Sequence, residues 1–370
     1  MRIVAVFGTR PEAIKMAPVL TRLGNAAGID LRVCVTSQHR QMLDQVLDVF
    51  GITPDWDLDL MRAGQGLTYV TASVLDGVHR LIKDERPDRV LVQGDTTTTM
   101  AASLAAFYEK VPVGHIEAGL RTGNIFSPWP EEMNRRLTSI IADLHFAPTE
   151  GSKRNLLAEG VQPERIVVTG NTVIDALFDA IQILDTDPNR LAKIEAELPP
   201  MLPDRRVILV TGHRRENFGG GLERVAHALL RLASRDDVQI VFPVHLNPNV
   251  QDTMYKALGG HPAIHLIKPL DYLPFVQMMR RANLIITDSG GVQEEAPSLG
   301  KPVLVTRDTT ERPEAVEAGT VELVGTEPDL LFRRATRLLD DEAAYGAMSR
   351  AHNPYGDGHA ADRIVEVLTR

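Results

Sequence analysis

The sequence predicts an α/β protein made of two domains. Two series of alternating strand and helix patterns support this class, one on each side of a stretch at 185–204 that contains four prolines. The chain has 370 residues, 44% of them hydrophobic, and a single hydrophobic core rarely covers that length. We therefore expect two separate cores, with the stretch at 185–204 as the bridge between them.

The first series begins with an apolar strand at 3–7 and closes with a helix that runs to residue 184. Its strands are short runs of Val, Ile, Leu and Phe, the pattern of strands that a parallel sheet buries on both faces. Between them, apolar residues recur at helical spacing, as at 67–82. The predicted strands are 3–7, 31–35, 90–92, the run that ends before Glu117, 142–146 and 166–168.

The second series repeats the same alternation after the bridge. The chain then closes with a glycine-rich turn at 353–358 and a helix that carries Ile364, Val365 and Leu368. The predicted strands are 207–210, 238–242, 264–267, 284–286, 303–306 and 321–324.

Composition excludes several functional classes. A net charge of −9 and a pI near 5.7 argue against a nucleic-acid scaffold. The single cysteine, Cys34, lies in an apolar run, which excludes a disulfide framework or a cysteine metal site and predicts a small buried residue. The start does not resemble a signal peptide, and no apolar run reaches 18 residues. We expect a cytoplasmic protein with no membrane partner.

The turn Asp288-Ser289-Gly290-Gly291 predicts a phosphate site. It follows an apolar strand and precedes a helix-forming segment, so free backbone N–H groups point out of the turn. Glu295, one helical turn later, could reach a ribose diol. The spacing matches neither a Walker A motif nor G-x-G-x-x-G. An ordinary strand-to-helix turn with a capping serine remains the alternative.

Cations follow other predicted strands. Arg10 and Lys15 come after the first strand and suit a diphosphate, although a solvated charged turn would give the same pattern. His213 follows the strand at 207–210 and stands before two arginines, which favours contact with a phosphate or leaving group. Arg312 offers one more cation, and Phe275 could face a uracil ring or the core.

Three carboxylates come at strand ends or at a helix start. Asp95 and Glu117 each follow a strand, and Glu131 lies in the first turn of a helix that begins after Pro130. Its neighbour Glu132 is predicted to be a cap or a solvated charge. Two or three carboxylates around a sugar are suited to moving protons and stabilising an oxocarbenium-like state.

Seven ordered motifs carry a resemblance that spans the whole chain. Together they resemble the bacterial non-hydrolysing UDP-N-acetylglucosamine 2-epimerases. The motifs are Gly8-Thr9-Arg10-Pro11-Glu12, Gly94-Asp95-Thr96-Thr97, His115-Ile116-Glu117-Ala118-Gly119-Leu120-Arg121, Pro130-Glu131-Glu132-Met133-Asn134-Arg135, Gly212-His213-Arg214-Arg215-Glu216, Thr287-Asp288-Ser289-Gly290-Gly291-Val292-Gln293-Glu294-Glu295 and Asn353-Pro354-Tyr355-Gly356-Asp357-Gly358.

The resemblance implies a fold and a reaction. The fold is the glycosyltransferase-B type, two Rossmann-like domains facing across a cleft, with the C-terminal helix returning to the first domain. We place the domains at 1–170 plus 355–370 and at 171–354. The reaction interconverts UDP-GlcNAc and UDP-ManNAc through elimination of UDP to a 2-acetamidoglucal and re-addition. It needs no NAD and no metal, and it would serve polysaccharide biosynthesis.

The resemblance also implies roles for single residues. Asp95, Glu117 and Glu131 would face the sugar and act in catalysis with His213. Gln38, Gln41 and His245 suit an allosteric UDP-GlcNAc, and family members are usually homodimers. The substrate-binding positions would be Arg10, Lys15, Asp95, Glu117, Arg135, His213, Leu270, Phe275, Ser289, Gly290, Gly291, Glu295 and Arg312, with the main chain of Leu270 serving the base.

Three other activities stay open. A hydrolysing relative would release free ManNAc and UDP after the same elimination, and another relative could act on a modified UDP-sugar such as a diacetamido uronate. A glycosyltransferase of the same fold is less favoured, because it needs an acceptor cleft and no set of carboxylates for C2.

Overall fold

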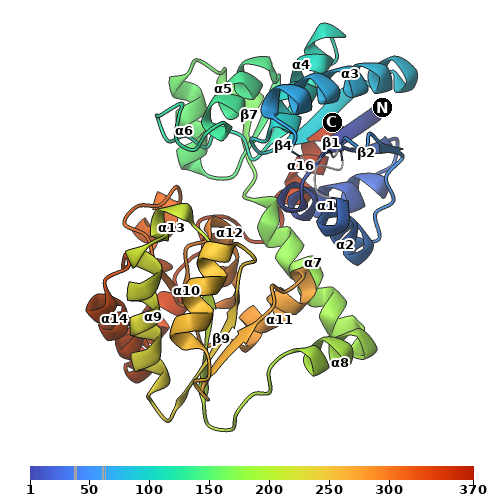
Figure 1. The fold of residues 1–370 in the computed structure, drawn as a ribbon. Helices are drawn as coiled ribbons and strands as arrows, with labels where there is room; N and C mark the ends of the chain where they lie inside the picture. Colours follow the sequence, from blue (N-terminus) through green and yellow to red (C-terminus); the bar gives the residue numbers. More distant parts are fainter. Residues whose placement is uncertain (37–39, 61, 63) are drawn as a thin grey trace. The chain divides into compact units, whose positions relative to one another are not determined.

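The structure is a computed structural model that describes residues 1–36, 40–60, 62 and 64–370, without the side chains of Arg40 and Gln41. Two compact units make up the chain, residues 1–179 with 355–370 and residues 180–354 (Figure 1). The division lies inside helix α7 (Thr172–Thr186), whereas the sequence placed it before that helix. The first half of α7 belongs to unit 1 because Asp175 accepts hydrogen bonds there from the N–H groups of Ala360 and Ala361.

Unit 1 contains a parallel sheet in the order β3-β2-β1-β4-β5-β6-β7. Six of its strands lie where apolar runs predict them, and the two-residue β3 was not predicted because it has no apolar run. The strands are β1 (Arg2–Phe7), β2 (Asp30–Val35), β3 (Trp56–Asp57), β4 (Arg89–Gln93), β5 (Val113–Ile116), β6 (Leu144–Ala147) and β7 (Ile166–Val168).

Helices cover both faces of this sheet because successive side chains of a strand point to opposite faces. Ile3 and Phe7 of β1 pack with the side of α1, α2 and α16, whereas Val4 packs with the side of α3 and α4. The last helix, α16, therefore belongs to the core of unit 1. The helices are α1 (Arg10–Gly24), α2 (Arg40–Phe50), α3 (Leu67–Glu85), α4 (Thr97–Tyr108), α5 (Glu131–Ile141), α6 (Glu150–Ala158), η1 (Pro163–Arg165) and α16 (Ala360–Thr369).

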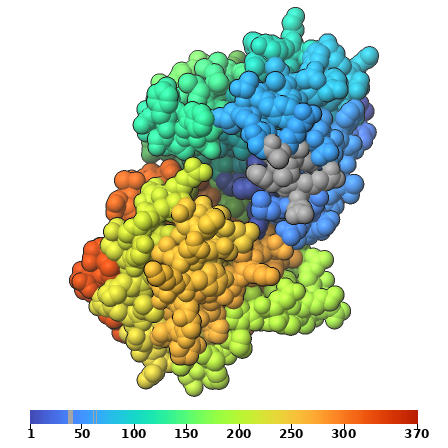
Figure 2. All heavy atoms as spheres, viewed as in Figure 1, coloured from blue at the N-terminus to red at the C-terminus, as the bar shows by residue number. Residues whose placement is uncertain are grey.

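Unit 2 contains a second parallel sheet, in the order β10-β9-β8-β11-β12-β13. Its strands are β8 (Arg206–Thr211), β9 (Val238–Pro243), β10 (Ile264–Ile267), β11 (Leu284–Thr287), β12 (Val303–Val305) and β13 (Val321–Leu323). Helices α9 and α10 form much of the face of unit 2 turned to the viewer in Figure 2, in yellow and light orange. The helices are α8 (Pro188–Glu197), η2 (Arg215–Asn217), α9 (Gly220–Ala233), α10 (Pro248–Leu258), α11 (Tyr272–Arg281), α12 (Gly290–Glu295), η3 (Ala296–Leu299), α13 (Pro313–Glu317), α14 (Pro328–Asp340) and α15 (Glu342–Ser349).

The strand order in each sheet reverses at one point. In unit 1 the reversal lies between β1 and β4, and in unit 2 between β8 and β11. Open parallel sheets of this type bind ligands outside the carboxyl ends of the strands at such a point. The predicted class, two Rossmann-like α/β domains, is confirmed. Among the described residues, no helix has the length and hydrophobicity needed to cross a membrane.

Candidate active site

Helix α5 begins with Glu131, and two later residues of the same helix hold Asp95 in unit 1. Glu131 is the first residue of α5, and Asp95 follows β4. From the same helix, Asn134 donates to the Asp95 carbonyl at 3.0 Å, and Arg135 holds the Asp95 carboxylate at 2.5 and 3.1 Å. Arg135 is therefore engaged with a protein carboxylate in this structure, and it fixes one of the three predicted sugar-facing groups.

Glu117 is held from three sides. Lys15 forms an ion pair with it, Gln93 donates to it at 2.5 Å, and Asn171 donates to it at 2.9 Å. The backbone of Glu117 has a φ of 63°, a left-handed conformation that costs a non-glycine residue about 1 kcal/mol. Strain of this kind is common at functional sites, where the surrounding structure enforces it. Lys15, predicted to contact a diphosphate, here balances the charge of a carboxylate.

Two other predicted residues of unit 1, Glu131 and Arg10, have charged groups that no described residue contacts by a hydrogen bond or ion pair. The side chains of Glu131 and Arg10 are half-buried, and neither makes a hydrogen bond or ion pair within the described part of the chain. Arg10 is the first residue of α1, directly after the carboxyl end of β1. Both side chains are therefore available to a ligand.

Glu12 joins the two turns that carry these groups, and the sequence did not single it out. Its carboxylate accepts the backbone N–H groups of Gly8 and Thr9 at 3.0 and 2.8 Å and the hydroxyl of Thr96 at 2.6 Å. Burial raises the pKa of Glu12, while these donors act in the opposite direction. The turn after β1 and the turn after β4 are thus held together by one side chain.

The expectation that Glu132 is a cap or a solvated charge is wrong. Its side chain is fully buried, and it accepts hydrogen bonds from the N–H groups of Thr122 and Gly123. It also forms ion pairs with Arg135 and Arg136, at 3.2 and 3.1 Å. A loop folded over the start of α5 explains the burial, and Glu132 thereby orients the arginine that holds Asp95.

His115 is a further residue that sequence patterns alone did not identify. It is buried in β5, and its Nε2–H donates to the carbonyl of Gly94 at 2.7 Å. Burial lowers the pKa of His115 to about 3, so the ring is neutral at physiological pH. Because Gly94 precedes Asp95, this hydrogen bond fixes the turn that presents Asp95. The only sequence signal was its place two residues before Glu117, inside the strand that Glu117 follows.

The predicted phosphate site of unit 2 lies at the start of α12. The N–H of Ser289 donates to Thr287 Oγ1 at 2.9 Å, and its hydroxyl makes no hydrogen bond within the described residues. A Cβ on Gly290 would lie 3.4 Å from the guanidinium carbon of Arg312, so the glycine leaves room for the Arg312 side chain. Arg312 also pairs with the buried Glu294 at 2.7 Å.

His213 lies beside this turn. Asp288, fully buried after β11, accepts from His213 Nδ1 at 3.1 Å. On the other side, the ring of His245 stacks against that of His213, with centroids 5.5 Å apart and an interplanar angle of 23°. His245, predicted for an allosteric ligand, therefore lies next to a predicted catalytic residue. Gln38 lies outside the described residues, as does the side chain of Gln41.

The remaining predicted residues of unit 2 lie on or beside α11 and α12. Tyr272 donates its hydroxyl to Glu295 at 3.0 Å, which connects the two helices. Leu270 precedes α11 and Phe275 lies in its first half, both half-buried. Across the described residues, no group of three His, Cys, Asp or Glu side chains is arranged to hold a metal ion.

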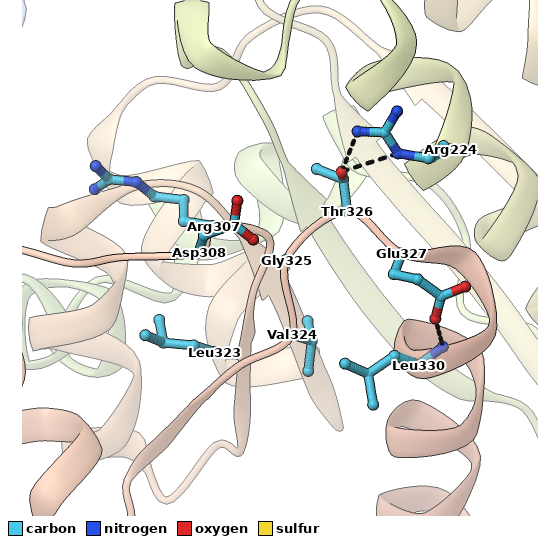
Figure 3. Close-up of a pocket in the computed structure, with 9 residues that line it drawn as sticks. All are labelled: Arg224, Arg307, Asp308, Leu323, Val324, Gly325, Thr326, Glu327 and Leu330. Carbon is cyan, nitrogen blue, oxygen red and sulfur yellow. Dashed lines mark hydrogen bonds between the residues drawn. The ribbon is translucent and has the colours of Figure 1, made fainter.

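A separate hollow of about 470 Å³ lies at the ends of β12 and β13 (Figure 3). Its cations are engaged with the protein. Arg224 donates to the Thr326 hydroxyl at 2.7 and 3.1 Å, and Arg307 pairs with Glu216 and Glu311. No residue singled out from the sequence lines it.

Comparisons with known proteins agree with the motifs. The family model described as UDP-N-acetylglucosamine 2-epimerase matches residues 21–369. The chain is 60% identical over 368 residues to a probable UDP-N-acetylglucosamine 2-epimerase of Ralstonia solanacearum, covering 99% of this chain and 98% of that one. It is 58% identical over 370 residues to the UDP-N-acetylglucosamine 2-epimerase of Escherichia coli K12, covering 100% and 98%.

A solved structure is similar over its whole length. The crystal structure of UDP-GlcNAc 2-epimerase from Neisseria meningitidis bound to UDP-GlcNAc superposes with a TM-score of 0.93, at 52% identity and full coverage of both chains.

Proposed function

The chain belongs to the UDP-N-acetylglucosamine 2-epimerase family, and on this basis we propose that it interconverts UDP-GlcNAc and UDP-ManNAc by inverting the configuration at C2. The observation that carries the proposal beyond the family match is the group of Asp95, Glu117 and Glu131 in unit 1. Two of these carboxylates are fixed by cations and amides of the same unit, and the third is uncommitted. Inversion at C2 requires such groups, because a hydrogen must leave one face and return to the other.

We propose an elimination and re-addition. The bond from C1 to the diphosphate oxygen breaks and its electron pair leaves with UDP, while a carboxylate of the group takes the proton from C2. The product pair is UDP and a 2-acetamidoglucal. Because C2–H is only weakly acidic, loss of UDP must run ahead of or alongside proton removal. A proton then returns to C2 on the opposite face, and UDP adds back to C1.

In this proposal the unit 2 residues bind the UDP portion. The backbone N–H groups at Ser289, Gly290 and Gly291 and the charge of Arg312 suit a diphosphate, which must gain negative charge as it leaves. His213 would contact the same group, and Leu270 and Phe275 would serve the base. The Neisseria relative crystallised with UDP-GlcNAc supports a UDP-sugar as the ligand.

The reaction in deuterium oxide tests the mechanism. With UDP-GlcNAc as the sole substrate, no NAD added and a chelator present, we expect deuterium at C2 of both recovered UDP-sugars, since a carboxylic acid exchanges its proton with solvent. Mass spectrometry and proton NMR of the C2 position give the result. Retention of the original hydrogen, or dependence on added NAD, would contradict the elimination.

The same incubation separates the alternatives. Free ManNAc and UDP in place of UDP-ManNAc would indicate a hydrolysing enzyme with the same first step. If UDP-GlcNAc does not react but a diacetamido UDP-sugar is turned over, the enzyme is an epimerase of the same class with a different substrate. Turnover that requires an added sugar acceptor would indicate a glycosyltransferase.

We also propose that the protein is a homodimer. The surface formed by the end of α4 and one side of α5 exposes Phe107, Tyr108, Leu137 and Ile140, the last at 80%. Helices α4 and α5 pack together, and several large exposed apolar side chains on two packed helices favour an interface. Sedimentation of the parent chain should give twice the mass of one chain, and an Ile140→Asp variant should shift toward the monomer. A monomeric parent would contradict the proposal.

A further inference from the structure

Asp288 lies beneath His213 and contacts it twice. Its side chain is fully buried, yet no cation of Lys or Arg pairs with it in the described structure. Instead its carboxylate accepts from His213 Nδ1 at 3.1 Å and from the backbone N–H groups of His213 and Arg214, both at 2.9 Å. The amide of Asn217 lies 3.4 Å away. Each hydrogen-bond partner of this carboxylate among the described residues is a donor.

This arrangement determines which nitrogen of the His213 ring carries a hydrogen. An ionised carboxylate only accepts hydrogen bonds, so Nδ1 must carry a hydrogen. Burial raises the pKa of Asp288, but the hydrogen bonds and charge of His213 and the backbone hydrogen bonds outweigh it and keep that pKa below its usual value. Nε2 makes no hydrogen bond within the described residues and is the ring atom left for a ligand. It donates to that ligand only when the ring is a cation.

His245 lies against the other side of the His213 ring. Its ring stacks on His213, and two positively charged rings at that distance repel each other. Burial lowers the pKa of His245, the charge of His213 lowers it further, and Asp288 acts weakly in the opposite direction. Two further cations, Arg214 and Arg215, follow His213 in sequence. The carboxylate of Asp288 contacts the His213 ring directly, so His213 is the ring whose positive charge this carboxylate can stabilise.

We propose that Asp288 is a positioning residue for His213: it holds the ring with Nδ1–H bound and Nε2 presented to the departing diphosphate, and it stabilises the imidazolium there. The proposal rests on the proposed epimerase function, since a diphosphate must leave for this charge to matter. Asp288 itself need not touch the substrate. A buried aspartate that sets the tautomer and charge of a histidine is a known way to prepare a catalytic ring.

The Asp288→Asn variant tests the proposal. An asparagine side chain has only one acceptor oxygen. In the parent the backbone N–H groups of His213 and Arg214 both donate to Oδ2 of Asp288, so the asparagine oxygen should take that place and the NH₂ group should face Nδ1. The ring must then accept at Nδ1 and place its hydrogen on Nε2 in the neutral form. We expect kcat to fall about a hundredfold, with the pH profile changed, because Nε2 then donates from a neutral ring and the positive charge facing the departing diphosphate is no longer stabilised; losses of this size follow the removal of one transition-state stabilising group. The change in KM should be smaller than the change in kcat.

The matched control is Asp175→Asn in unit 1. Asp175 is also fully buried and also accepts two backbone N–H groups, those of Ala360 and Ala361, but no histidine contacts it within the described chain. This variant should unfold at a lower temperature and keep the parent kcat and pH profile. A similar loss of kcat in both variants would assign the effect to stability and overturn the proposal.

The double variant Asp288→Asn with His213→Gln gives the sharpest readout. If Asp288 acts through the ring, the double variant should turn over no more slowly than His213→Gln alone, because effects of residues that act as a unit do not add. A further hundredfold loss would show an independent structural role and overturn the proposal.

A spectroscopic measurement keeps the proposal testable even if Asp288→Asn fails to fold or the parent does not epimerise. Nitrogen-15 NMR of the parent, with the His213 signal assigned by its loss in His213→Gln, should show the hydrogen on Nδ1 in the neutral ring. The Nε2–H tautomer in the parent would overturn the assignment. Correct tautomers with no epimerisation of any UDP-sugar would leave the geometry in place and refute the proposed function alone.

Discussion

Replacing Glu12 with alanine should destabilise unit 1 strongly. The change removes the acceptor of two backbone N–H groups, those of Gly8 and Thr9, in a region with no other described acceptor for them. An unsatisfied buried donor costs about 1 to 3 kcal/mol, so the buried Gly8 N–H and the part-buried Thr9 N–H together cost about 3 kcal/mol in unfolding free energy. The hydroxyl of Thr96 adds less, because it can rotate toward another partner.

Glu12→Gln should cost only about 1 kcal/mol. The amide oxygen can still accept both backbone N–H groups, and the NH₂ then faces the hydroxyl oxygens of Thr96 and Thr99, which can accept. Because the turns keep their places, turnover should stay within about threefold of the parent. Glu12→Ala should lose more than about tenfold, since small displacements of catalytic groups have large effects.

Tryptophan fluorescence isolates the unit in question. Both tryptophans of the chain, Trp56 and Trp129, belong to unit 1, so urea unfolding followed by fluorescence reports on that unit. Circular dichroism reports on both units and separates the transitions. The exposed Glu164→Ala serves as control and should stay within about 0.5 kcal/mol of the parent. Equal losses for Glu12→Ala and Glu12→Gln would refute the reasoning, because they would show that the acceptor oxygen is not what matters.

Three further outcomes are expected. Asp95→Asn and Glu117→Gln should each lower turnover at least about a hundredfold while calorimetry shows UDP binding preserved; near-parent turnover would make that carboxylate structural. Burial raises the pKa of Cys34 to about 12, so at pH 8 only about one thiol in 10⁴ is ionised, and a thiol reagent should label it only after unfolding; prompt labelling of the native chain would contradict this. Burial raises the pKa of Glu311, but the hydrogen bonds and charge of Arg307 outweigh it and bring that pKa to about 2, below the ordinary 4.5. The stabilisation is therefore complete above pH 4.5 and is lost as the pH falls toward 2, so Glu311→Gln should lower the calorimetric unfolding temperature more at pH 7 than at pH 3, and an equal shift at both would refute the pairing.

All strands of the two sheets except β3 could be predicted, because each of them contains an apolar run that a parallel sheet buries on both faces. The same rule places Asp95, Glu117 and His213 at the carboxyl ends of strands, where such sheets bind ligands. Strand β3 was not predicted, because a strand of two residues contains no apolar run. Its register comes from its neighbour, with Trp56 opposite Cys34.

Buried polar side chains could not be assigned from the sequence. Glu131 and Glu132 are adjacent in the first turn of one helix, yet one is uncommitted and the other fully buried. Their directions differ by about 100° around the helix axis, and only the loop at 122–123 decides which one is covered. Asp288 is a similar case, because its role depends on a turn 75 residues earlier in the chain.

The charges of each unit are largely balanced within that unit. In unit 1 Lys15 pairs with Glu117 and Arg135 with Asp95, and in unit 2 Arg312 pairs with Glu294. Electrostatic groups fixed in this way before the ligand arrives need little reorganisation during reaction. Removing one partner of a largely buried pair leaves an uncompensated charge, and that cost is separate from any lost ligand contact. A defect in Lys15→Met therefore does not by itself show that Lys15 binds the diphosphate. Combining Lys15→Met with Glu117→Gln removes the uncompensated charge. If UDP affinity recovers in this double variant, the role of Lys15 is to balance the carboxylate. If the affinity stays low, Lys15 binds the nucleotide.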